Sequence, residues 1–222
     1  GDGISDVLVV DDRGNSSKLY LNKGDEKFRA AGLELGRRNQ GWGMVAVAGD
    51  YTGDGKEDVY FTNVDFSAGR LLLRLLDQSG LNAKDDPSLA RARTLFNGNH
   101  LFRASGAGGF RELTENAGVG WSGEAAAGAA WVDYNNDGLL DLYVANDVGT
   151  ADVLFHNRRD GTFQEVSLES GTHDRRASMG LAVGDLWHRG WLDLFATHWV
   201  AEDHALWNNR TDEFGDKVPI TF

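Results

Sequence analysis

The sequence predicts an all-β protein assembled from repeated units of about four strands each. Two nine-residue segments, residues 50–58 and 133–141, share one pattern of Asp, Gly and polar residues. The last Asp of each segment lies 52 residues from a matching Asp, since 58 − 6 = 52 and 193 − 141 = 52. Short runs of β-branched and aromatic residues flank both segments, as expected for strands bounded by turns.

The strands of one unit follow in order from this pattern. Residues 45–48 run into an acidic segment and residues 58–62 leave it, which gives the first two strands. A third strand is expected in the phrases at 19–22, 154–157 and 206–209, each of which ends in an Asn 16 residues after the last Asp. Phe28, Phe110 and Phe163 begin a fourth, weaker segment, such as 28–31.

An insertion interrupts the second unit. Asp58 and Asp141 are 83 residues apart, 31 more than the repeat requires, and most of the excess falls at 65–98. Residues 71–76 are rich in Leu, and Asp86 followed by Pro87 is typical of a helix start. We therefore expect a short helical insertion. It is either surface decoration or a cap over a binding surface, because long loops on rigid scaffolds often carry function.

A repeat of roughly 40–50 residues with about four strands is typical of a β-propeller blade, whereas a solenoid would have a shorter repeat or a helix in each unit. We divide the partial propeller, 1–222, into units near 1–49, 50–132 (with the insertion 65–98), 133–184 and 185–222. Asp2 and Asp6 occupy the fifth and ninth positions of an acidic segment that would start before Gly1. We therefore expect the chain to be part of a longer protein.

Composition excludes several classes of function. The net charge of −12 argues against nucleic-acid binding, which requires a basic surface. The chain has no Cys, so disulfides and thiolate sites are absent, and no apolar run is long enough to span a membrane. The acidic segments at 50–58 and 133–141 also have the pattern of all-oxygen Ca²⁺ sites, and weak sites of this kind fill where calcium is millimolar. An extracellular, cell-surface or periplasmic location is therefore expected.

The two acidic segments predict Ca²⁺ sites. Each offers side-chain oxygens at positions 1, 3, 5 and 9, a carbonyl at position 7, and a Gly at position 6 that permits a sharp turn. Calcium takes roughly six to eight oxygen ligands in such arrangements. The predicted ligands are Asp50, Thr52, Asp54, the carbonyl of Lys56 and Asp58 in one segment, and Asp133, Asn135, Asp137, the carbonyl of Leu139 and Asp141 in the other, with Asp2 and Asp6 as a partial third set.

Ordinary metal-free turns are the alternative, since Asp, Asn and Gly also favour turns. An EF-hand is excluded, because the Glu required at position 12 would fall at Phe61 and Val144, within predicted strands. Thr52 is a weaker ligand than Asn135, so the first site is expected to bind less tightly.

The segment at 185–193 departs from this pattern. It keeps both terminal Asp residues but has Trp187 and Arg189 at positions 3 and 5. We expect it to bind no metal, with Arg189 pairing with Asp185 or Asp193 and replacing the charge of an ion.

These segments and their flanks resemble FG-GAP/VCBS repeats, the blades of integrin alpha-like β-propellers. The phrases at 42–50, 99–103 and 109–119 are similar, more specifically, to bacterial relatives of cartilage acidic protein, which often carry an ASPIC/UnbV domain. The resemblance implies a seven-bladed propeller, Ca²⁺ in the acidic loops, and secretion or exposure at the cell surface.

The sequence favours a non-enzymatic function, because it contains none of the common hydrolase, metalloprotease or phosphate-loop motifs. His198 and His204, with two acids between them, could bind a transition metal, and His173–Asp174 could form an acid/base pair. We interpret both as ordinary loop residues. Most of the Trp residues are expected to pack between blades, with Trp42 and Trp121 as candidates for stacking on a sugar.

Three functions are compatible with these observations. The first is a calcium-stabilised extracellular scaffold for adhesion or protein interaction, with a protein or glycan ligand at the cell surface. The second is the propeller part of a carbohydrate-active enzyme, either a polysaccharide lyase or a hydrolase. The third is a structural subunit of a surface assembly.

Overall fold

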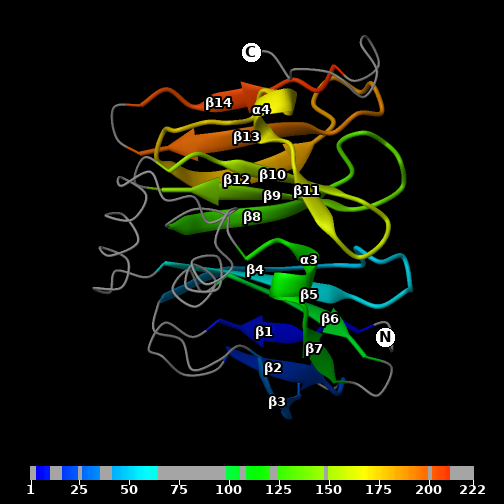
Figure 1. The fold of residues 1–222 in the computed structure, drawn as a ribbon. Helices are drawn as coiled ribbons and strands as arrows, with labels where there is room; N and C mark the ends of the chain where they lie inside the picture. Colours follow the sequence, from blue (N-terminus) through cyan, green and yellow to red (C-terminus); the bar gives the residue numbers. More distant parts are fainter. Residues whose placement is uncertain are drawn as a thin grey trace.

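Four antiparallel sheets are stacked face to face in the computed structural model of the chain (Figure 1). The structure describes residues 4–10, 17–24, 27–35, 42–64, 99–105, 109–120, 125–147, 150–199 and 202–210. The predicted insertion at 65–98, with its helix, lies outside these residues. The all-β class is confirmed.

Each sheet is a meander in which consecutive strands pair. Sheet 1 contains β1 (Val7–Val9), β2 (Ser17–Asn22) and β3 (Phe28–Leu35). Sheet 2 contains β4 (Trp42–Gly49), β5 (Asp58–Val64), β6 (His100–Ala104) and β7 (Phe110–Glu112). Sheet 3 contains β8 (Ala126–Val132), β9 (Asp141–Asn146), β10 (Val153–Asn157) and β11 (Phe163–Glu165). Sheet 4 contains β12 (Ser178–Gly184), β13 (Asp193–His198) and β14 (Ala205–Trp207).

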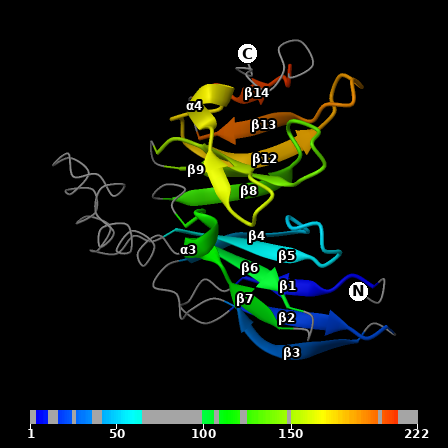
Figure 2. The same ribbon diagram turned by 45° about the vertical axis from the view of Figure 1, so that its right-hand side comes forward.

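The predicted strands are confirmed, and the acidic segments join the first and second strands of sheets 2 and 3. Each of those sheets therefore begins one strand ahead of its acidic segment. The weak strand predicted at 28–31 is longer than expected, since β3 continues to Leu35. Two one-turn helices were not predicted: α3 (Thr114–Ala117) and α4 (Ser167–Ser170), each ended by a Gly with positive φ. They follow β7 and β11 on the same side of the stack (Figure 2).

Apolar side chains on both faces of the second strand of a sheet contribute to the core. In β9, Leu142 and Val144 pack in one cluster with Tyr60 of sheet 2. Tyr143, between them, packs in another cluster with Leu194 of sheet 4. Because successive side chains of a strand point to opposite faces, one strand fills the interfaces with both neighbouring sheets.

Aromatic rings fill the interface between sheets 2 and 3. Trp131 stacks on Tyr51 with centroids 5.8 Å apart and an interplanar angle of 7°. Its indole Nε1 donates a hydrogen bond to the carbonyl of Val47 at 3.3 Å. Trp207 is likewise buried between sheets, against Tyr143. The prediction that Trp residues pack between blades is confirmed for these two.

Two other Trp residues do not pack in this way. Trp187 and Trp199 are 56% and 57% exposed, because both lie in connections outside the sheets. The side chain of Trp42 and the whole of Trp121 lie outside the described residues.

The sheets have the form of propeller blades, but the described residues do not close a ring. Sheet 1 has three strands and lacks a counterpart of β4, while sheet 4 has three and lacks a counterpart of β7 among the residues described. Helices α3 and α4, the two that the structure describes, have four residues each, and neither could cross a membrane.

Gly49 provides a test of this packing. A Cβ atom at Gly49 would lie 2.6 Å from Cδ1 of Trp131, a distance that forces the ring to move. We expect Gly49→Ala to lower the free energy of unfolding by about 1–3 kcal/mol, as overpacking of a core does. Urea unfolding followed by tryptophan fluorescence measures the change.

Gly184→Ala is the matched control, because Gly184 holds the same repeat position in sheet 4 and a Cβ there meets nothing within 4 Å. This variant is expected to be neutral or slightly stabilised, since Ala restricts the unfolded chain more than Gly does. Equal destabilisation by the two substitutions would show that sheet 3 does not pack on Gly49 as described.

Candidate cation-binding loops

Three related loops lie along one edge of the stack, where they connect the first two strands of sheets 2, 3 and 4 (Figures 1 and 2). We call them loop 2 (residues 50–58), loop 3 (133–141) and loop 4 (185–193). The structure brings the predicted ligands of each site together within one loop, because the chain reverses tightly between two paired strands.

The first Asp of each loop holds the turn closed. Asp50 accepts hydrogen bonds from the amides of Asp54 at 3.0 Å and Gly55 at 2.6 Å. Asp133 accepts the equivalent bonds from Asp137 at 3.0 Å and Gly138 at 2.9 Å. The Gly residues have φ of 80° and 83°, a conformation that L residues with side chains rarely adopt. The Gly at position 6 is therefore required by the turn.

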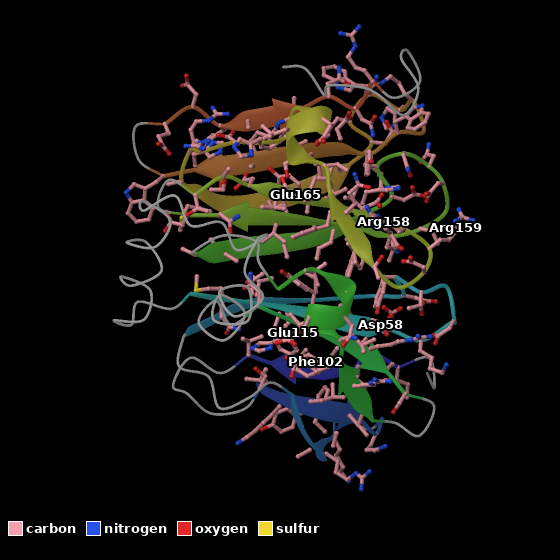
Figure 3. All side chains as sticks on the ribbon, viewed as in Figure 1. Asp58, Phe102, Glu115, Arg158, Arg159 and Glu165 are labelled. Atoms are coloured by element: carbon pink, nitrogen blue, oxygen red, sulfur yellow. The ribbon has the colours of Figure 1, made fainter. Side chains whose placement is uncertain are left out.

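Asp58, the last residue of loop 2, is fully buried. Its Oδ1 accepts a hydrogen bond from the amide of Ala104 at 2.8 Å, while its buried Oδ2 has no hydrogen-bond partner. Burial, with the charges of Asp54 and Asp50 nearby, raises the pKa of Asp58 to about 6. The carboxyl faces the same edge of the stack as Arg158 and Arg159 (Figure 3). An unpartnered, buried carboxylate oxygen is costly unless a cation or a proton meets it.

Asp141, the matching residue of loop 3, is also fully buried. Its Oδ1 accepts a hydrogen bond from the amide of Asn157 at 2.7 Å, and Nδ1 of His156 lies 3.2 Å from the same oxygen. Burial, with Asp137 and Asp133 nearby, raises the pKa of Asp141 to about 8. Both loops therefore hold an ionisable carboxyl at a place that disfavours negative charge without a counter-ion.

The remaining predicted ligands lie in the turns themselves. Thr52 donates a hydrogen bond to Oδ1 of Asp50, and Oδ1 of Asn135 accepts one from the amide of Asp137. Among the described residues, no three acidic or histidine side chains already surround a single point. Ion binding would require the carboxylates at positions 1, 5 and 9 to turn toward a common centre.

Basic side chains distinguish loop 2 from loop 3. In loop 2, Arg103 Nη2 lies 3.2 Å and Lys56 Nζ 3.3 Å from Oδ2 of Asp54, and hydrogen bonding to Arg103 lowers the pKa of Asp54. In loop 3, Arg159 donates to the backbone carbonyl of Asp137 at 2.9 Å. This contact does not involve the carboxylate of Asp137. Arg103 and Lys56 therefore compete directly with a cation for a ligand of loop 2.

Loop 4 contains its own cation. Nη2 of Arg189 lies 3.0 Å from Oδ1 of the buried Asp193 and also donates to Oδ1 of Asn208. The backbone amide of Arg189 bonds to Asp185. The predicted pairing of Arg189 with the acids of this loop is confirmed.

Of the partial set in the first unit, Asp6 lies within the described residues and Asp2 lies outside them. Asp6 Oδ1 accepts a hydrogen bond from the amide of Asn22 at 2.8 Å, the same contact that Asp141 makes with Asn157.

A contact between sheets was missed by sequence reasoning. The side-chain amide of Asn157 donates to the carbonyls of Leu140 at 3.0 Å and of Tyr51, in loop 2, at 2.8 Å. Asn209 repeats this arrangement one sheet later, donating to Leu192 at 3.1 Å and to Tyr134, in loop 3, at 2.6 Å. The sequence feature that marks this contact is the constant spacing, because Asn157 and Asn209 each lie 16 residues after the last Asp of a loop. We call each Asn with its two carbonyls a clamp.

At the opposite edge, the structure joins the two histidine clusters noted in the sequence. His198 Nε2 lies 3.4 Å from Oδ2 of Asp174, and its Nδ1 donates to the carbonyl of Asp203 at 2.8 Å. Arg176 bonds to both oxygens of Asp174, and the resulting pKa of Asp174 lies below its usual value despite burial. His198 is buried, and its Nδ1 is hydrogen-bonded whereas its Nε2 has no hydrogen-bond partner. The pair is therefore enclosed by the fold and does not open to solvent.

A repeated contact closes the second and third strands at this edge. The amide of Asn146 donates to Oδ1 of Asp152 at 2.7 Å, and that of Asn63 donates to Oδ1 of Asn99 at 2.9 Å. Asn63 and Asn99, which flank the predicted insertion at 65–98, therefore lie at this edge. Asp152 is buried, and its Oδ2 accepts hydrogen bonds from Tyr143 and Ser178, both at 2.8 Å.

Stacked meanders of three and four strands, with related loops between their first two strands, define a repeat protein built of propeller-type blades. The chain belongs to the FG-GAP-like repeat family, whose model matches residues 1–61, 88–144 and 133–196. No curated protein matches the chain.

Among solved structures, the chain is similar to one described as a lectin from Agrocybe aegerita that recognises non-reducing terminal N-acetylglucosamine. The two are 13% identical with a TM-score of 0.42, and the match covers 86% of this chain and 46% of that one. The chain thus spans about half the length of that structure.

The buried Asp152 predicts a pH dependence of stability. Burial raises the pKa of Asp152 from its ordinary value of 3.8 to about 7. Since the pKa is higher in the folded state, the contribution of Asp152 to stability is full below about pH 4 and is lost as the pH rises to about 7. The comparison is Asp152→Asn, which copies Asn99 of sheet 2. Between pH 5 and 7, the free energy of unfolding of the wild type should fall relative to that of the variant by up to about 1.4 kcal/mol per pH unit.

Urea unfolding at pH 5, 6, 7 and 8 measures this difference. Asp160→Asn is the control, because hydrogen bonds from Thr162 lower the pKa of Asp160 and keep its titration below this range. Its profile should run parallel to that of the wild type. Parallel profiles for wild type and Asp152→Asn would contradict the assignment.

Proposed function

We propose that the chain is part of a calcium-stabilised β-propeller that serves as an extracellular, cell-surface or periplasmic scaffold for binding a protein or glycan. The observation that carries the calcium assignment is the buried Asp58, whose Oδ2 has no hydrogen-bond partner and which lies near two further acids. Oxygen is the donor type that Ca²⁺ prefers, and loops 2 and 3 offer oxygen donors only.

Calcium would be held in loop 2 by Asp50, Thr52, Asp54, Asp58 and the carbonyl of Lys56, and in loop 3 by the residues at the same positions. When bound, the ion supplies positive charge that offsets the repulsion among the carboxylates of each loop. The turn hydrogen bonds of the first Asp, already present, hold the backbone in position for this. Loop 4 has Arg189 instead, and we propose that it binds no ion.

Further blades are proposed next to sheet 1, in a ring of seven. Val7 and Val9 of β1 are 43% and 48% exposed, although they hold positions that face the preceding sheet elsewhere in the stack. The matching residues of sheets 2–4 are all buried: Val59, Phe61, Leu142, Val144, Leu194 and Ala196. A preceding blade would cover Val7 and Val9 in the same way. Within the family, we propose that the chain is a relative of the ASPIC/UnbV-bearing bacterial proteins.

Binding is favoured over catalysis because the histidine of the His198–Asp174 pair is buried and both members of the pair are bonded to other protein groups. The edge opposite the cation loops is the proposed ligand side. It carries the exposed Trp199, a ring suited to stacking on a sugar or a protein side chain, and both ends of the insertion. A glycan array together with a turnover assay on acidic polysaccharides separates a binding scaffold from a lyase or hydrolase.

Calcium is expected to raise the melting temperature of the chain, and EDTA to lower it, because a ligand that binds the folded state stabilises it by mass action. At a calcium concentration about 100 times the Kd, the stabilisation amounts to about 2.7 kcal/mol per site. Differential scanning calorimetry at neutral pH measures it. Asp50→Ala and Asp133→Ala should each remove part of the shift, whereas Asp185→Ala should leave the calcium-dependent part intact. An unchanged melting temperature on chelation would refute the calcium proposal.

Arg103→Ala is expected to strengthen ion binding in loop 2. The substitution frees Oδ2 of Asp54 from a guanidinium 3.2 Å away. Because this ion pair is exposed, it competes only weakly with an ion, and the calcium affinity should rise by up to roughly fivefold. Isothermal titration calorimetry in an Asp133→Ala background, in which loop 2 is the remaining site, measures the gain. Weaker binding would mean that Arg103 supports the site.

A further inference from the structure

We propose that the clamp of Asn157 couples ion binding in loop 2 to ion binding in loop 3, so that each ion increases the affinity of the other. The inference rests on the calcium sites proposed above. It assigns a role to Asn157, a residue that is not itself a proposed ligand.

One end of this link lies in loop 3. The amide of Asn157 donates to Oδ1 of Asp141 at 2.7 Å, and its side-chain Nδ2 donates to the carbonyl of Leu140 at 3.0 Å. Asn157 is thus held by Asp141, the proposed ligand at position 9 of loop 3, and by Leu140, the residue before it. Any force that fixes Asp141 also fixes the position of Asn157, which is buried and has little freedom to adjust.

The other end lies in loop 2. The same Nδ2 donates to the carbonyl of Tyr51 at 2.8 Å, and Tyr51 stands between the proposed ligands Asp50 and Thr52. The Tyr51 ring is itself buried against Trp131 of sheet 3. An ion in loop 2 would fix the position of the Tyr51 carbonyl. A fixed carbonyl favours the position of Asn157 in which it also bonds to loop 3.

The coupling follows from this shared contact. In each loop without an ion the carboxylates repel one another, so bringing their oxygens toward a common centre costs free energy. If the first ion orders its loop and the clamp, the second ion meets a loop that is already partly ordered and therefore binds more tightly. Reciprocity requires that the effect be equal in both directions.

The repeat supplies a matched control. Asn209 makes the same clamp between sheets 3 and 4, where it joins loop 3 to loop 4, which has Arg189 in place of an ion. In sheet 2 the corresponding residue is Ala104, whose amide still bonds to Asp58 but whose side chain cannot form a clamp. Asn157 is therefore the clamp that joins two proposed ion loops.

The test is a double-mutant cycle on the ion affinity of loop 3. Calcium is titrated into the apo chain, and the amide NMR signals of Gly55 and Gly138 report loops 2 and 3 separately, because each amide bonds to the first Asp of its own loop. Asp50→Ala, which disables loop 2, should raise the calcium concentration at half-occupancy of loop 3 by roughly fivefold or more, the lower end of usual coupling. In an Asn157→Ala background, Asp50→Ala should leave it unchanged.

Asn209→Ala should leave the coupling intact, and Asn157→Leu, which keeps most of the side-chain volume, should abolish it as Asn157→Ala does. If both loops bind calcium independently in the wild type, or if the coupling survives in the folded Asn157 variants, the coupling proposal is overturned while the calcium sites stand. If neither Gly55 nor Gly138 responds to calcium, the calcium sites themselves are refuted.

Discussion

The structure depends on buried carboxylates at the point where each sheet turns from its first strand to its second. Asp58, Asp141 and Asp193 are each almost fully buried, and each accepts a hydrogen bond from the amide at the end of the third strand of its sheet. The carboxylate therefore ties the start of the second strand to the end of the third. When such a carboxyl is ionised, its charge must be balanced by a cation, and without one a proton neutralises it, because water cannot reach the site.

The chain balances that charge in two ways. Loop 4 uses the guanidinium of Arg189, which is covalently part of the protein and needs no ion. Loops 2 and 3 have no Arg at the position of Arg189. Arg103 and Lys56 pair with Asp54 rather than with the buried Asp58, and further acids near Asp58 and Asp141 help to raise the pKa of each. Under the calcium proposal, the charge of loop 4 is balanced by the chain itself, whereas loops 2 and 3 would require an ion.

Much of the fold could be predicted from sequence because the repeat fixes both the order of the strands and the face of each side chain. The pairing of Arg189 was predictable because two acids of a nine-residue loop must meet a basic residue placed between them. The clamps could not be predicted, although the spacing of Asn157 and Asn209 was visible, because their acceptors are backbone carbonyls of a different sheet. The exposure of Trp187 and Trp199 could not be predicted, because composition cannot distinguish an aromatic residue of a connection from one of a strand.

The central proposal is that divalent ions occupy loops 2 and 3. The most direct measurement is native mass spectrometry of the chain after equilibration with excess calcium and removal of unbound ions. We predict two calcium ions per chain for the wild type and one for a chain in which either loop has lost its first Asp. A wild-type chain that retains no calcium under these conditions would contradict the account.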